Sequence, residues 1–140
     1  YLDLMREAAL DSFTRVARRG LFDARKATAN LLSEPEPPTA ILAGHDDIAI
    51  EVLAALDECG YRYGDVSVVG YDNTDIAAHP LLSLTSVDQC GAAMGAEAVT
   101  MLLERIRGRT EPRRYVATPT LQVRRSSSPP PTWPPKGQRE

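Results

Sequence analysis

Short apolar runs alternate with amphipathic segments along most of the chain. The runs TAILAG (39–44) and VSVVGYD (66–72) are continuous enough to predict buried strands of a parallel sheet. LSLTSVDQ (82–89) is predicted to be a third extended segment. Because helical patterns separate these runs, the sequence predicts an α/β fold, a parallel sheet with helices on both faces.

Four segments have helical periodicity, at about residues 2–10, 22–32, 46–59 and 91–107. Asp46 or Asp47 is expected to cap the third helix at its start. Gly60 and Gly108 are expected to end the third and the fourth, because glycine readily takes the left-handed conformation found there.

Two further segments are predicted to be extended. A short strand is expected around residues 13–17. From Tyr115 to Arg125 apolar and polar side chains alternate, but Pro119 lacks the N–H that a central strand needs. This segment therefore predicts two short strands or an edge strand.

Composition narrows the function classes. The net charge of -3 differs from the positive charge typical of a protein that binds nucleic acid through a basic surface. Cys59 and Cys90 have no metal-ligand spacing, so no metal site is expected, and they fit a reduced, cytoplasmic setting. No apolar run is long enough to span a membrane. Residues 128–140 are rich in proline, lack an apolar pattern and are predicted to be a disordered tail.

Polar or aromatic residues follow three of the predicted strands. Asp72 ends the second apolar run, His45 follows the first, and Phe22 opens the helix after residues 13–17. Ligands of open α/β sheets bind beyond the carboxyl ends of the strands. An aromatic ring, an imidazole and a carboxylate at one rim predict a site for a polyhydroxylated or heterocyclic ligand.

Several motifs carry a family resemblance in the same order and spacing as in the family. They are PPTAI (37–41), DVSVVGYDN (65–73) and LTSVDQ (84–89). With GAAMGAEAVTMLLERI (91–106), they make residues 1–127 resemble the C-terminal lobe of the effector-binding core of lactose-repressor-like (LacI/GalR) regulators. The resemblance implies a periplasmic-binding-protein-like type I fold, with residues 90–108 as a crossover helix, and a cytoplasmic regulator.

By this resemblance, Asp72, Phe22 and His45 are the expected effector contacts. Asp72 matches the family carboxylate that accepts hydrogen bonds from a sugar or nucleoside-like effector, and Phe22 matches the stacking aromatic. His45 departs from the asparagine or small polar residue usual at its position, which leaves the identity of the effector open. The family pairs as homodimers and binds operator DNA through an N-terminal headpiece, which has no counterpart in these 140 residues.

Each candidate residue also has a plainer interpretation. Asp72 is a turn carboxylate without the resemblance, His45 is equally well a solvated loop residue, and Phe22 is alternatively the first core residue of its helix. Asp46 is expected to cap its helix and not to contact effector. The alternative function is a type I solute-binding protein of a transport system.

Catalysis is not expected. YDNTD (71–75) is similar to the strand-end motif of aspartyl phosphatases, but Thr74 stands where their general acid would be. No phosphate loop, dinucleotide fingerprint or nucleophile elbow occurs, and no cofactor is expected.

The helix at 91–107 is predicted to be the weak point of the chain. In the family it packs against the N-terminal lobe, which this sequence does not supply. Its broad apolar surface is therefore expected to fold back on its own lobe, to pair with a second copy, or to leave the helix displaced and mobile.

Overall fold

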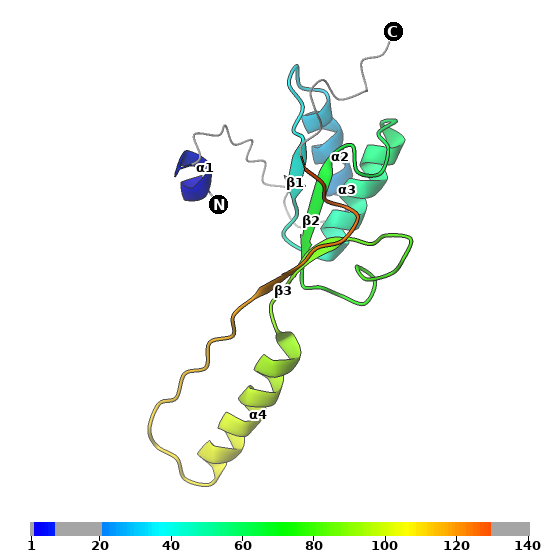
Figure 1. Ribbon diagram of the computed structural model, residues 1–140. Coiled ribbons are helices and arrows are strands. Elements are labelled where there is room, and N and C mark those ends of the chain that lie inside the picture. The colour runs from blue at the N-terminus through cyan, green and yellow to red at the C-terminus, as the bar shows by residue number, and fades with distance from the viewer. Residues whose placement is uncertain (1, 8–20, 130–140) are drawn as a thin grey trace.

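The computed structural model describes residues 2–7 and 21–129 of the chain (Figure 1). Its first helix, α1, covers Leu2–Glu7, the first part of the helix predicted to end near residue 10. The strand predicted at 13–17 and nearly all of the proline-rich tail lie outside the described ranges.

A four-stranded sheet in the order β1-β2-β3-β4 forms the centre of the fold. Its strands are β1 (Ala40–Leu42), β2 (Ser67–Tyr71), β3 (Thr85–Asp88) and β4 (Thr120–Gln122). The first three are parallel, as predicted, and they confirm the α/β fold class. The sheet is mixed and mostly parallel, because β4 returns antiparallel to β3.

The prediction of an edge strand within residues 115–125 is confirmed by β4, which lies at the end of the sheet order. Of residues 115–125, only three pair with β3, and pairing starts immediately after Pro119. Proline has no N–H to donate to the ladder, so this edge strand is confined to its C-terminal side.

Two helices, α2 (Leu21–Leu32) and α3 (Asp46–Glu58), pack against each other on the same side of the sheet (Figure 1). α3 connects the parallel strands β1 and β2, and such a crossover is right-handed in nearly all proteins, which fixes the face on which α3 lies. The inner side of α3 meets the inward side chains of β2 and the loop after it. This core consists of Ala43, Ala49, Val52, Leu56, Val66, Val68, Ala77 and Leu84.

The chain then leaves the sheet as an arm, residues 90–119, in which α4 (Gly91–Ile106) is followed by an extended return segment (Figure 1). Gly108, at φ 103°, makes the turn after α4, as predicted. Arg113 bonds Glu97 and Glu104 across the arm. None of the residues of α4 is buried.

Candidate functional site

The loop that follows β2 has an unusual backbone. Asp72 and Asn73 have φ of 106° and 50°, so two consecutive non-glycine residues lie at positive φ. Such conformations are uncommon and persist where the surrounding contacts over-determine them. One contact is from the Asp72 amide, which donates to the Val87 carbonyl at 2.9 Å. The loop therefore turns sharply at the carboxyl end of β2.

The Asp72 carboxylate lies between residues that follow two other strands. Its Oδ2 is 3.1 Å from Nδ1 of His45, which follows β1, and its Oδ1 accepts from Nε2 of Gln89, which follows β3, at 2.8 Å. The Asp72 side chain is 28% exposed and that of His45 is 66% exposed. An ionised carboxylate offers about four acceptor positions, so Asp72 can also accept hydrogen bonds from a ligand.

A second carboxylate, Asp46, lies beneath this loop in the interior and is only 1% exposed. Its Oδ1 accepts from the Ser86 hydroxyl at 2.6 Å, and its Oδ2 accepts from the amide and the hydroxyl of Thr74, both at 2.8 Å. The expectation that Asp46 or Asp47 caps α3 is wrong. His45 is the N-cap residue, and it makes no side-chain cap bond. Asp46 is instead the first helical residue, and partners distant in sequence take its carboxylate.

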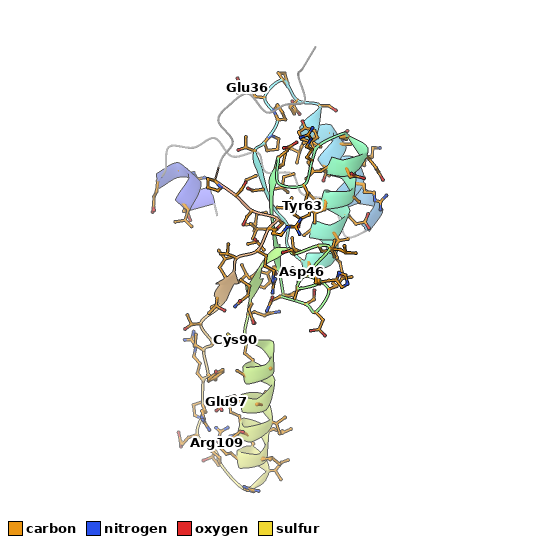
Figure 2. The ribbon with its side chains drawn as sticks, turned by 45° about the vertical axis from the view of Figure 1, so that its right-hand side comes forward. Glu36, Asp46, Tyr63, Cys90, Glu97 and Arg109 are labelled. Carbon is orange, nitrogen blue, oxygen red and sulfur yellow. The ribbon has the colours of Figure 1, made fainter. Side chains whose placement is uncertain are left out.

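Asn73 links this interior to the base of the arm. Its amide N–H donates to the Ser86 hydroxyl at 3.0 Å, and its side-chain NH2 donates to Asp88 at 3.1 Å. Arg124 donates to its side-chain oxygen at 2.6 Å. Asp88 also accepts from the amide of Cys90, the left-handed residue immediately before α4. Figure 2 shows Asp46 at the arm end of the sheet and Cys90 at the junction between the sheet and the arm.

The structure brings together two of the three predicted site residues, Asp72 and His45. Phe22 lies in the first turn of α2, but its side chain is outside the part of the structure that is described. Gln89 and Asp46 were not predicted as members of the site. The rule that pointed to Asp72 would also have indicated Gln89, since it follows a strand.

Neither a candidate metal site nor a candidate membrane-spanning helix occurs in residues 2–7 and 21–129. These residues contain no group of three histidine, cysteine or acidic side chains placed to hold a metal ion. They also contain no helix long and apolar enough to cross a membrane.

Comparisons with known proteins give one family. Residues 1–127 match the model of the periplasmic binding protein-like domain. The HTH-type transcriptional repressor PurR of Escherichia coli (strain E24377A) is 41% identical over 103 residues, which are 72% of this chain but 30% of that protein.

Solved structures agree with the sequence match. A transcriptional regulator CelR–cellobiose complex superposes with a TM-score of 0.78 at 31% identity, over 90% of this chain and 40% of that one. The lac repressor dimer bound to operator and the anti-inducer ONPF also gives 0.78, at 26% identity, over 90% of this chain and 45% of that one. The chain thus spans less than half the length of these three relatives.

Proposed function

The chain belongs to the periplasmic binding protein-like domain family, in its LacI/GalR regulator branch, and from this premise we propose that residues 1–127 are one lobe of the effector-binding part of a transcription regulator. The proposed effector is a small sugar or a nucleoside-like molecule. The relatives named above are regulators, which favours this function over transport of a solute.

The observation that carries the proposal is the Asp72 carboxylate, held at the strand ends by His45 and Gln89 and still open to solvent. Hydroxyl groups of a sugar, or N–H groups of a heterocycle, would donate to it. His45 would meet the same ligand through its second ring nitrogen, which can donate or accept. For Phe22 we propose stacking on the flat side of the ligand, by resemblance alone.

The wider role is proposed from relatives longer than this chain. We propose a cytoplasmic homodimer that reaches operator DNA through a headpiece outside these residues, with no catalytic step. Effector binding would act by linkage, because it shifts the balance between lobe arrangements only if one of them binds the ligand better.

Ligand titration followed by NMR tests the proposal. The probes are pentoses, hexoses, cellobiose and purine bases, added to the ¹⁵N-labelled chain. Binding is expected to be weak, with Kd no tighter than about 1 μM, since each missing charged hydrogen bond from a second lobe costs about 1.5–3 kcal/mol. Shifts should concentrate at His45, Asp72 and Gln89.

The Asp72→Asn variant should weaken binding by at least about tenfold, because an NH2 group replaces one acceptor oxygen. Asp75→Asn is the matched control, because Asp75 is exposed and its substitution removes the same charge three residues further along the chain. Absence of binding by every probe, or equal loss in both variants, would contradict the proposed site.

A further inference from the structure

We propose that Asp46, through Ser86 and Thr74, is a positioning residue that holds loop 72–74 and so sets where the Asp72 carboxylate points. The inference rests on the proposed effector site, and it assigns a role in that site to a residue that does not itself meet the ligand. Its basis is a set of contacts that converge on the loop from below.

The first step is the direction of the Asp46 hydrogen bonds. All three come from residues in or under the loop, namely Ser86 and both polar groups of Thr74. Ser86 in turn accepts from the Asn73 amide. Residues 73 and 74 are therefore each bound to Asp46, directly or through one hydroxyl.

The second step is burial. Asp46 and Ser86 are 1% and 0% exposed, so water cannot replace a lost partner. The space is also closed, because a Cβ placed on Gly70 would lie 2.3 Å from Oδ1 of Asp46. A buried carboxylate needs its donors in place, and here those donors are the backbone and side chains of the loop.

The third step is the loop's own conformation. Positive φ at Asp72 and Asn73 is unfavourable for side-chain-bearing residues, so the loop needs anchors to keep it. A cap for α3 would be the simplest use of Asp46, but α3 has no side-chain cap bond. The Asp46 carboxylate serves the loop and not the helix that carries it.

Ser86→Ala and Ser126→Ala form a matched pair that separates positioning from plain stability. Both serines are fully buried, and each accepts one backbone N–H and donates one hydrogen bond. Ser126 bonds Thr85 and Val68, and neither of these residues belongs to loop 72–74. Losing either serine should lower stability, and losing Ser86 should lower it more, because its hydroxyl donates to a carboxylate and that of Ser126 to a neutral carbonyl.

NMR of the ligand-free chain gives the first readout. In Ser86→Ala and Asp46→Asn, the backbone amides of residues 72–74 and the side-chain NH2 of Gln89, which binds Asp72, are expected to shift. In Ser126→Ala these signals should stay in place. Equal shifts in both serine variants, or unmoved loop signals in Ser86→Ala, would overturn the proposal.

The second readout is the Kd of a sugar or purine probe that binds the parent chain. Ser86→Ala should raise its Kd by about tenfold, the scale of one hydrogen bond to a charged group, while Ser126→Ala should leave it unchanged. If the signals of loop 72–74 shift only in Ser86→Ala but both serine variants bind the probe with the same Kd, the claim that this loop conformation affects ligand binding is overturned. If no probe binds, the proposed effector class fails, and the ligand-free signals still decide whether Asp46 positions the loop.

Discussion

Gly70 gives a sharp quantitative prediction, because the structure leaves no room for a methyl group there. A Cβ at this position would lie 2.3 Å from Oδ1 of Asp46, 3.1 Å from Cδ2 of Leu84 and 3.4 Å from Cβ of Ala49. The first distance is far below van der Waals contact. Asp46 cannot simply swing aside, since three hydrogen bonds hold its carboxylate.

The cost of Gly70→Ala follows from two unfavourable contributions and one favourable. Overpacking a closed core costs about 1–3 kcal/mol. Displacing Oδ1 of Asp46 from Ser86 weakens a buried charged hydrogen bond worth about 1.5–3 kcal/mol. Alanine restricts the unfolded chain and returns about 0.4–1 kcal/mol. The net loss in the free energy of unfolding is about 2–5 kcal/mol, a large part of the roughly 5–15 kcal/mol usual for a domain.

Urea unfolding followed by far-UV circular dichroism measures this difference. Gly44→Ala is the matched control, because no atom lies within 4 Å of its Cβ position. That variant should stay within about 0.5 kcal/mol of the parent chain. If Gly70→Ala lies within about 1 kcal/mol of Gly44→Ala at an unchanged denaturant slope, Asp46 is not confined as described.

Two further predictions concern the arm. Amides of α4 should exchange with solvent faster than those of α3, because no α4 residue is buried and Leu102 and Ile106 are 59% and 72% exposed. Equal protection of both helices in a chain that sediments as a monomer would contradict this prediction. The hydrogen bond from Arg113 holds the pKa of Glu104 below its ordinary 4.5, so this pair supports the arm fully above that pH and ceases to do so as pH falls through the lowered pKa. Protection factors of the arm amides, which correct for the intrinsic pH dependence of exchange, should fall over that acid range. Arg113→Ala should weaken this pH dependence and leave the smaller contribution of Arg109, which also contacts Glu104; an unchanged dependence in the variant would contradict the assignment.

Much of the fold could be predicted from local pattern alone. The runs at 39–44 and 66–72 contain β1 and β2. The helix predicted at 91–107 is α4, which ends one residue earlier. These signals are short-range, since burial and helical spacing repeat over a few residues. The antiparallel course of β4 was not visible, because pairing partners are set by the path of the arm and not by the pattern of residues 120–122.

The candidate site, too, could be predicted only in part from the sequence. Asp72 and His45 could be placed together because each follows a strand, and parallel strands end at one edge of the sheet. Asp46 could not, because an aspartate before a helical pattern is most simply a cap. Its true partners, Thr74 and Ser86, lie 28 and 40 residues further along the chain, and nothing local distinguishes them.

The arrangement of these residues explains why a charged side chain lies in so small a core. His45 and Asp46 are adjacent, yet one faces solvent at the rim and the other is buried, so consecutive residues contact the same loop from outside and from below. An apolar residue at 46 would avoid the desolvation of a carboxylate but would leave the Thr74 amide and the Ser86 hydroxyl without an acceptor. The free energy spent on burying Asp46 is therefore recovered as a defined loop conformation. A defined loop is what a binding carboxylate such as Asp72 requires, because a ligand that must first order its own site binds less tightly by the cost of that ordering.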